Sequence, residues 1–574
     1  MAIINTQQFP RATARNDQDL PPGYNDTNDS QRYITYSLVI PVYRAFPIFV
    51  ALLLVIGVVI GFTSTYFAGA SVGVFDAKVI NSGDTAWVLT ASALVLLMTP
   101  AVGWFYAGMV TSKNVIGVIK QTLLILAVVS IQWVLIGYSL VFGKDVNGII
   151  GGLNFFALSG VGYAPSAYAP TIPQTAFMIF QAMGAIIAPA LIIGSIVERM
   201  RFRTVVIFVL LWTTLVYDPI AHWVVGDGGW LHNMGALDFA GGTFVHAAAG
   251  FSGLAAAIVV GKRGGFKVGQ AIVSHNIPLV LLGAGVLWFG WLGFNGGSAL
   301  AASPLAVNAF VVTNTAGAAG ALVWMILSWA ENKKPSALAT AIGAVCGLIA
   351  ITPASGYVGP VAAIAIGLIA GVVTYMALHI RSKHFHIDDT LDVWAAHGIG
   401  GVTGLILAGV FAEKVINVGG NNGLLFGNPG QLGIQILTAS VTLGYAFIAT
   451  YILLKFLAPL GLRVSRRQEE EGLDLAIHGE EGYQLATNNA PKVEDRITQL
   501  EEEVAALRDQ AAKQESELEN AMRSPRGPIF PGQQTYVPGM SALRPIDSQV
   551  DQATFEPSRQ TQKRPAIKRI GLMS

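Results

Sequence analysis

The stretch "LDFAGGTFVHAAAGFSGLAAAIVVG" (237–261) is long enough to cross a membrane, yet it carries a carboxylate at Asp238 and an imidazole at His246. Spanning the hydrocarbon core of a bilayer takes about 20 apolar residues. Gly242, Gly250 and Gly253 recur with His246 at helical spacing. We therefore expect the imidazole on a helix face of small residues, which another helix or a narrow lumen can approach closely.

A second stretch, "DDTLDVWAAHGIGGVTGLILAGVFA" (388–412), has the same pattern, with acidic residues at its start and His397 inside a stripe of small residues. A titratable group inside a bilayer is costly and normally faces a partner, a cavity or a path. Either histidine alone is equally well explained by a hydrogen bond between helices. The matched pair favours a functional site at the midplane, between two structurally related halves.

The two stretches are predicted to cross the membrane in opposite directions, with Asp238 starting a helix on the extracytoplasmic side and Asp392 starting one on the cytoplasmic side. The predicted repeat is therefore inverted. Two imidazoles brought together in a low-dielectric site hold at most one proton and titrate as a unit. A neutral pair suits a small polar molecule better than a metal ion with only two ligands.

The composition places most of the chain in a membrane. Of the 574 residues, 53% are hydrophobic and 12% are charged, so too little polar surface is available to cover a soluble globule. The net charge of +1 gives no indication of a nucleic-acid partner. The single cysteine, Cys346, excludes a disulfide within the chain and any Cys-based metal site.

Hydrophobic windows of the required length begin near Ala45, Thr85, Ile119, Gln174, Phe202, Asp238, Asn276, Val307, Ser336, Val358, Asp392 and Leu432. Lys and Arg concentrate in the loops after every second window. The positive-inside rule then predicts a cytoplasmic C-terminus and an extracytoplasmic start for the windows from Thr85 onward.

Composition also divides the chain into segments. Residues 1–44 form a polar leader, and residues 45–70 are either an extra uncleaved transmembrane helix or a signal sequence cleaved near Ala70. The transmembrane domain covers 85–459, and a regulatory tail covers 460–490. Residues 493–522 have a short heptad pattern, which predicts a coiled coil or a solvated amphipathic helix, and residues 523–574 are predicted to be disordered.

A third stretch, "HNIPLVLLGAGVLWFGWLGFNGGSAL" (275–300), places Trp288, Trp291, Phe294, Asn295 and Ser298 near its extracytoplasmic end. An aromatic face and a hydroxyl oxygen at a pore mouth can hold a small cation. Taken alone, the aromatic residues are better explained as a belt at the membrane interface.

Together these segments resemble the ammonium transporter family (Amt/Mep/Rh), and its Amt branch in particular, from about Thr85 to Tyr483. The motifs that carry the resemblance, in the family's order, are "GWFYAGMVTSKNV" (103–115), "ERMRF" (198–202), "GALDFAGGTFVHAAAG" (235–250), "GWLGFNGGSA" (290–299), "TPASGYVGP" (352–360), "DDTLDVWAAHGIGG" (388–401) and "GLRVSRRQEEEGLDLAIHGEEGY" (461–483).

The resemblance implies an all-α polytopic membrane protein. The implied fold is an eleven-helix bundle of two inverted five-helix halves, here with one extra N-terminal hydrophobic helix and a C-terminal coiled coil. It also implies a homotrimer with a pore in each subunit, in the cell (plasma or inner) membrane and surrounded by the lipid bilayer.

The resemblance further implies roles for single residues in the pore and its mouth. These are the twin pore histidines His246 and His397, the hydroxyl of the external ammonium site Ser298, the pore-occluding Phe294, the pore-lining Trp291, the buried acidic Asp238, and the acidic pair Asp389 and Asp392. Two positions depart from the family pattern. The outer gating phenylalanine falls on Gly184 and an extracytoplasmic tryptophan on Val225, and the nearby candidates to replace them are Phe180, Trp223 and Trp230.

The function implied is transport: ammonium binds near Ser298 and loses its proton, and ammonia follows the line of the two histidines. An ammonium sensor is the alternative, because the tail resembles the family segment that meets a PII-type signalling protein. A channel for another small gas is a third interpretation. No enzymatic activity, cofactor or metal is expected, because the sequence has no nucleotide-binding loop, catalytic triad or metal-ligand cluster.

Overall fold

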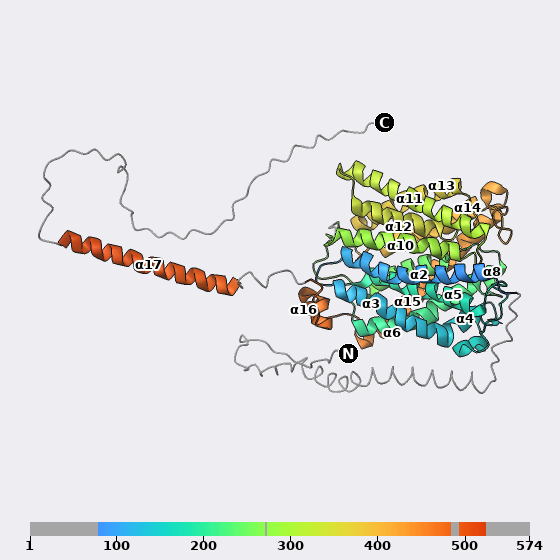
Figure 1. The fold of residues 1–574 in the computed structure, drawn as a ribbon, viewed down its shortest axis with the longest axis horizontal. Coiled ribbons are helices and arrows are strands. Elements are labelled where there is room, and N and C mark those ends of the chain that lie inside the picture. Colours follow the sequence, from blue (N-terminus) through green and yellow to red (C-terminus); the bar gives the residue numbers. More distant parts are fainter. Residues whose placement is uncertain (1–78, 270–272, 484–492, 524–574) are drawn as a thin grey trace. The chain divides into compact units, whose positions relative to one another are not determined.

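The computed structural model describes residues 79–269, 273–483 and 493–523, which fall into two compact units divided after residue 484. The first unit is a bundle of apolar helices (Figure 1). Within the described ranges, ten helices are long and apolar enough to cross a membrane. The predicted all-α, multi-pass membrane architecture is therefore confirmed, while the division into two inverted halves stays a prediction. Residues 1–44, 45–70 and 524–574 lie outside the described ranges.

Five of the membrane segments precede residue 261. They are α2 (Ser82–Met109), α3 (Val115–Gln132) with η1 (Trp133–Gly137) and α4 (Tyr138–Phe142), α5 (Gln174–Ile196), α6 (Phe202–Trp212) with η3 (Thr213–Tyr217) and α7 (Asp218–Val225), and η4 (Gly242–Ala247) with α9 (Ala248–Val260). A short antiparallel hairpin, β1 (Asp145–Val146) and β2 (Ile150–Gly151), the 3-10 turn η2 (Leu153–Leu158) and α8 (Trp230–Asn233) lie in the connections. The segments η1, η3 and η4 are π-helical.

The remaining segments follow residue 276. They are α10 (Ile277–Gly297), α11 (Pro304–Asn332), α12 (Ala337–Ile351), α13 (Pro360–His384), the π-helix η5 (Trp394–Ile399) with α14 (Gly400–Phe411), the 3-10 turn η6 (Leu424–Phe426), and α15 (Pro429–Leu457) with η7 (Ala458–Leu460). Each predicted window from Thr85 to Leu432 coincides with one of these helices. The window at Ser336 corresponds to α12, which is apolar but shorter than the others.

Local sequence signals explain where these helices begin. In α10, α11, α13 and α15 a proline occupies the first turn, where its missing N–H is not needed. The side chains of Asn276 and Ser303 accept hydrogen bonds from the first turns of α10 and α11. Proline in the first turn thus marks all four starts, and a polar side-chain cap precedes the apolar run in α10 and α11.

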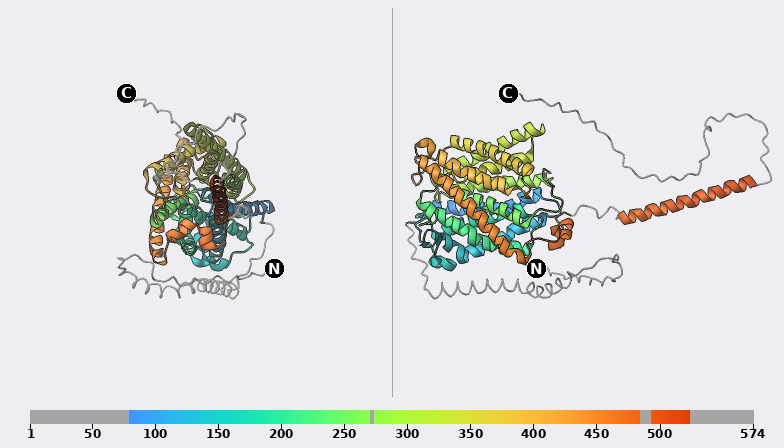
Figure 2. Two further views of the ribbon diagram at one scale, coloured as in Figure 1. Left: turned by 90° about the vertical axis from the view of Figure 1, so that its left-hand side faces the viewer. Right: turned by 180° about the vertical axis from the view of Figure 1, so that it is seen from behind.

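Two segments form the centre of the bundle. Helix α5 and the η4–α9 segment are buried along most of their length and pack against each other. Helix α10 packs along α2, and α15, the long orange helix that crosses the bundle in the right-hand view of Figure 2, packs on α9 and α6. Helix α5 from the first part of the domain and α15 from its last part therefore both pack on the η4–α9 segment, which contains His246.

The two ends of the domain differ in character. At one end, near α8, lie the β1–β2 hairpin and the loops around it, which we call the mouth face. At the other end lie α16 (Arg466–Glu471) and the π-helix η8 (Asp474–His478), which we call the tail face (Figure 1). Two backbone hydrogen bonds, from Arg201 to Leu462 and from Val464 to Arg199, attach the start of the tail to the bundle.

The second unit is described through one continuous helix, α17 (Val493–Arg523). Its heptad-position residues Ile497, Leu500, Val504, Leu507 and Leu518 are exposed in the single chain. A continuous helix is required by both interpretations of this segment, so the coiled coil stays a prediction.

The segments that carry the two histidines approach each other at a pair of glycines. A Cβ atom at Gly250 of α9 would lie 2.0 Å from the backbone nitrogen of Gly398 in η5. A Cβ atom at Gly401 of α14 would lie 2.8 Å from the backbone nitrogen of Ala247. Only glycine permits these backbones to be so close, and this confirms the expectation that small residues near His246 allow another helix to approach.

We expect Gly250→Ala to lower the thermal unfolding temperature of the full chain in detergent. The added methyl group must displace backbone, and overpacking of this kind costs about 1–3 kcal/mol. Gly444→Ala in α15 is the matched control, because a Cβ there has no neighbouring heavy atom within 4 Å. Alanine is the better helix former, so the control should unfold at the same or a higher temperature. Equal shifts in both variants would contradict the close contact.

Candidate functional site

His246 and His397 lie side by side in the centre of the bundle. Their Nδ1 atoms are 3.3 Å apart, and their ring centroids are 5.4 Å apart with an interplanar angle of 25°. Both side chains are buried. Two nitrogens at this distance can share one hydrogen, so one ring donates and the other accepts. The pair thus has the geometry that the sequence predicts.

The starts of η4 and η5 are each held by an aspartate. The Asp238 carboxylate accepts hydrogen bonds from the backbone N–H groups of Gly241, Gly242 and Thr243 at 2.7–3.0 Å. The Asp389 carboxylate accepts one from the N–H of Trp394 at 2.8 Å. A carboxylate is favoured at a helix N-terminus because the first N–H groups lack partners within the helix.

Asp389, which holds η5, occupies the same relative position as Asp238, which holds η4. Asp389 lies eight positions before His397, as Asp238 lies eight positions before His246. Asp392 instead forms an ion pair with Arg381 of α13. Burial raises the pKa of Asp392 to about 7, although the Arg381 charge acts in the opposite direction. Asp389 is therefore the counterpart of Asp238 in holding the helix start, while the helix itself begins beside Asp392, whose backbone carbonyl accepts from the N–H of Ala396.

Two predicted aromatic residues extend the line of rings from the histidine pair. Trp291 of α10 stacks on His246 with centroids 5.1 Å apart and an interplanar angle of 21°. Its indole N–H donates to the hydroxyl of Thr352 at 2.8 Å, which fixes the ring. Phe294 meets His246 edge-on at 6.3 Å. One helical turn further along α10, the Ser298 hydroxyl donates to the carbonyl oxygen of Phe294 at 2.9 Å.

A tyrosine occupies the space beside the first position that departs from the family pattern. A Cβ atom at Gly184 would lie 3.1 Å from the hydroxyl oxygen of Tyr217. The Tyr217 ring packs edge-on against Phe244 of η4, with centroids 5.7 Å apart. Tyr217 was missed by the sequence analysis, because no local pattern around "LVYD" indicates that its hydroxyl reaches α5.

The candidate replacements for the missing aromatic residues lie in different surroundings. Phe180 contacts α10 closely, since a Cβ at Gly297 would lie 2.6 Å from its ring. Trp223 donates its indole N–H to the carbonyl of Ile149 at 2.7 Å and packs on Tyr445 and Trp230. Val225, at the end of α7, is half-buried. Phe180 is thus the candidate that lies next to the Phe294–Ser298 segment.

A cavity of about 540 Å³ reaches the second histidine from the tail face. Its lining includes His397, Asp389, Asp392, Arg381 and Glu331. One oxygen of Asp389 has no hydrogen-bond partner within the described protein. The cavity therefore gives access to His397 along a largely apolar wall that carries a few charged side chains, whereas Trp291 and Phe294 lie against His246.

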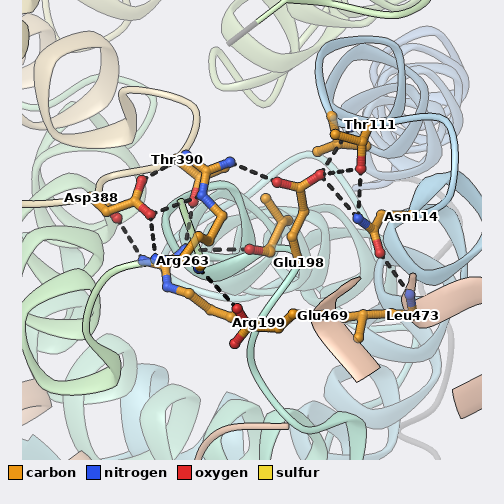
Figure 3. A network of polar contacts seen from close by, with 12 residues as sticks. Thr111, Asn114, Glu198, Arg199, Arg263, Asp388, Thr390, Glu469 and Leu473 are labelled. Carbon is orange, nitrogen blue, oxygen red and sulfur yellow. Dashed lines mark hydrogen bonds and ion pairs between the residues drawn. The ribbon is translucent and has the colours of Figure 1, made fainter. Parts of the chain in front are cut away.

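Next to this cavity lies a polar network that the sequence analysis did not identify (Figure 3). Arg263 donates to Glu198 at 2.6 Å and to Asp388 at 2.7 and 2.8 Å. Glu198 also accepts hydrogen bonds from Thr111 and Asn114 at 2.7–3.0 Å. Arg263 belongs to one of the basic loops between hydrophobic windows, and the fold places its largely buried side chain between two carboxylates.

The tail is part of the same network. Asn114 accepts a hydrogen bond from the backbone N–H of Leu473 at 2.8 Å while it donates to Glu198. The Asp474 carboxylate accepts from the N–H groups of Ile116 and Gly117 at 3.0 and 2.7 Å, and so caps the start of α3. A continuous set of contacts therefore joins the tail to Asp388, the residue before the aspartate that holds η5.

The charges of this network shift its pKa values. Burial opposes ionisation of Glu198, but the Arg263 charge and the hydrogen bonds from Thr111 outweigh it, so the pKa of Glu198 is lowered. The pKa of Asp388 is lowered in the same way, because Arg263 and Arg199 outweigh its burial. Burial lowers the pKa of Arg199 to about 10, although Asp388 opposes that shift. Both carboxyl groups are thus held in the ionised form.

Comparison with known proteins matches most of the domain. The model of the Ammonium Transporter Family matches residues 86–483. Ammonium transporter Amt1 of Archaeoglobus fulgidus is 47% identical over 405 residues, which cover 70% of this chain and all of that protein. The ammonium transporter of Bacillus subtilis is 46% identical over 406 residues, which cover 71% of this chain and 99% of that protein.

Solved structures are similar over the same part of the chain. Mep2 of Candida albicans is 34% identical with a TM-score of 0.65, over 69% of this chain and 89% of that one. A structure described as a sensor Amt protein is 32% identical with a TM-score of 0.63, over 69% of this chain and 98% of that one. The matched region is the membrane domain together with the tail at its end.

Replacing Arg263 by alanine leaves two buried carboxylates without their cation. Breaking a buried ion pair from one side costs about 3–5 kcal/mol, so we expect a much lower thermal unfolding temperature for Arg263→Ala in detergent. Arg466→Ala is the control. Arg466 pairs with Glu470 one turn away on the surface, with both side chains more than 70% exposed, so no measurable change is expected.

The same ion pairs give stability a pH dependence whose sign follows from the lowered pKa values. The ionised carboxylates stabilise the folded state fully above their ordinary pKa values, which are 4.5 for Glu198 and 3.8 for Asp388. This stabilisation is lost as the pH falls through the lower pKa values of the folded state. The wild-type unfolding temperature should therefore fall on acidification below about pH 4.5, and that of Arg263→Ala should fall less steeply. Equal slopes would contradict this assignment.

Proposed function

Because the chain belongs to the Ammonium Transporter Family, we propose that it transports ammonium, or the ammonia derived from it, across the membrane in which its helices lie. Its relatives are transporters, which confirms the prediction that the chain is not an enzyme. The observation that carries the proposal is the contact between two buried histidines on facing glycine-lined helices.

The proposed mechanism must select ammonium over potassium, although the two cations are similar in size. Only ammonium can donate directional hydrogen bonds and give up a proton. A dry, narrow passage rejects a bare ion because desolvating a charge costs far more than desolvating a neutral molecule. A passage that admits only the neutral molecule therefore selects ammonia over every alkali cation.

In this proposal, ammonium binds at the mouth near Ser298 and loses a proton, which is the second product of that step. Ammonia passes Phe294 and Trp291 and then exchanges hydrogen bonds with His246 and His397. It leaves by the cavity that reaches His397 from the tail face. Asp238 and Asp389 act as positioning residues, because they hold the starts of the two histidine-bearing segments. Asp392 holds the side chain of Arg381 in the cavity wall through their ion pair.

The two departures from the family pattern affect the mouth in this proposal. A π-face attracts a desolvated cation by about 0.5–2 kcal/mol, and Gly184 and Val225 each remove one such face. Phe180, which lies against Gly297, and Tyr217, whose hydroxyl lies beside Gly184, are the remaining aromatic groups in that region. We propose that they form the outer wall of the ammonium site.

We also propose the arrangement that the resemblance implies. The chain forms a homotrimer in the cell membrane with the tail face in the cytoplasm, and α17 packs against its copies as a coiled coil. The tail, covering 460–483 of the described chain, is proposed to dock a PII-type signalling protein. The six positively charged loops at alternate windows support the proposed sidedness.

An ammonium sensor is the second candidate function. One observation favours it: the tail is joined to the start of η5 through Asn114, Glu198, Arg263 and Asp388. A change at the histidine pair could thus alter the tail without net transport. A solved relative described as a sensor adds weight to this alternative.

The direct test is His397→Ala in the full chain, with uptake of labelled methylammonium into liposomes as the measurement. Leaving a buried polar molecule without its hydrogen-bond partner costs about 1–3 kcal/mol, so uptake should fall by about 5- to 150-fold. His232→Ala, which changes an exposed histidine outside the pore, should leave uptake unchanged. Unchanged and still selective uptake by His397→Ala would overturn the assignment.

Current recorded in the same liposomes separates the candidate functions. Uptake with current indicates that the proton crosses as well, and uptake without current indicates passage of the neutral molecule alone. We expect the wild type to take up methylammonium and to restore growth on limiting ammonium. Ammonium binding with neither uptake nor growth rescue would instead establish the sensor.

A further inference from the structure

A buried carboxyl group lies in the membrane domain outside the pore site. Asp218 is the first residue of α7, directly after the π-helix η3, and its side chain is fully buried. No ion pair of Asp218 is found in the described part of the chain. An isolated carboxylate inside a bilayer is costly, so this residue requires an explanation.

The Oδ2 atom of Asp218 accepts a hydrogen bond from an amide. Gln132, the last residue of α3, donates from Nε2 to Asp218 Oδ2 at 2.8 Å and to the Thr214 hydroxyl at 3.2 Å. Gln132 is itself buried, and its amide covers Gly137 of η1. The remaining oxygens of the pair, Asp218 Oδ1 and Gln132 Oε1, have no hydrogen-bond partner among the residues that the structure describes. Both are acceptors, and no donor in that part of the chain serves either.

One proton removes this deficit. Placed on Asp218 Oδ1, it makes the side chain a neutral acid with a donor of its own, and Gln132 Oε1 is an acceptor in the same hydrogen-bonded pair. We propose that Asp218 and Gln132 form a proton-binding site within the membrane domain, in which Asp218 holds a proton taken from solvent and Gln132 accepts its hydrogen bond. The amide then both donates to and accepts from the acid.

The adjacent histidine is committed elsewhere. His222, one helical turn after Asp218, places Nδ1 2.7 Å from the Val141 carbonyl oxygen and Nε2 2.9 Å from Asp145 Oδ1. Both nitrogens therefore face oxygen atoms of other residues, and neither hydrogen-bonds Asp218. The hydrogen bond from His222 lowers the pKa of Asp145. Asp145 thus has the His222 ring beside it, whereas Asp218 has no basic side chain as a partner in the described part of the chain.

The protonated state matters for the wall of the proposed pore. Asp218 directly follows Tyr217, whose hydroxyl lies beside Gly184 and whose ring packs on Phe244. A carboxylate there would attract and retain a cation, whereas the acid leaves the wall uncharged. This consequence for the pore wall rests on the proposed function, whereas the protonation of Asp218 does not. Experiments can therefore contradict one of them without contradicting the other.

Infrared spectroscopy of the reconstituted full chain tests the proposal without any transport assay. The difference spectrum of wild type minus Asp218→Asn at neutral pH should contain the carbonyl stretch of a protonated carboxylic acid, shifted to lower frequency in D₂O. The same difference for Asp145→Asn should contain carboxylate bands and no acid carbonyl. Carboxylate bands in the Asp218→Asn difference would overturn the proposal.

Gln132→Leu tests the partner and remains informative if Asp218→Asn does not fold. Removal of the acceptor should move the acid carbonyl band to higher frequency, because a carboxylic acid free of hydrogen bonds absorbs higher. In wild type the band should disappear at strongly alkaline pH. An acid band whose frequency is the same in Gln132→Leu would contradict the pairing.

Discussion

The structure depends on one constraint: polar groups buried in a membrane domain must find their partners inside the protein. His246 and His397 meet this constraint by sharing a hydrogen between their Nδ1 atoms, which requires their helices to approach at Gly250, Gly398 and Gly401. The same constraint places Asp238 and Asp389 at the free N–H groups that start these helices. The histidine contact, the glycines and the aspartates are therefore parts of a single arrangement.

Much of this arrangement is predictable because it leaves regular traces in the sequence. Apolar windows and loop charges indicate the helices, and matched histidine and glycine spacing indicates the central pair. Other features leave no such trace. The π-helices have no periodic signal, and "DDTLD" offers three aspartates among which only the backbone at Trp394 selects Asp389. Tyr217 reaches Gly184 across helices that are distant in sequence. A local sequence pattern cannot predict contacts that form only when distant segments pack together in the fold.

The polar network illustrates a different gap between sequence and structure. A charge near the end of a membrane helix is read first as a topology signal, and Arg263 fits that pattern. In the fold it also joins Glu198 to Asp388, and Asn114 brings in the backbone of the tail at Leu473. The same residue can thus set orientation during insertion and hold the folded domain together afterwards. The sequence predicts the first role, and the structure shows the contacts of the second.

The Nδ1 contact between the two histidines also determines the polarity of the pair. When one ring donates from Nδ1, its own Nε2 is an acceptor and the Nε2 of the other ring is a donor. Transfer of the shared hydrogen, with a matching exchange at the outer nitrogens, reverses this polarity and leaves the rest of the pair unchanged. The two arrangements differ in their surroundings, because Nε2 of His246 is buried without a hydrogen-bond partner in the described chain, whereas His397 lines the cavity. The two faces of the pair thus meet different groups, with the rings of Trp291 and Phe294 against His246 and the cavity at His397.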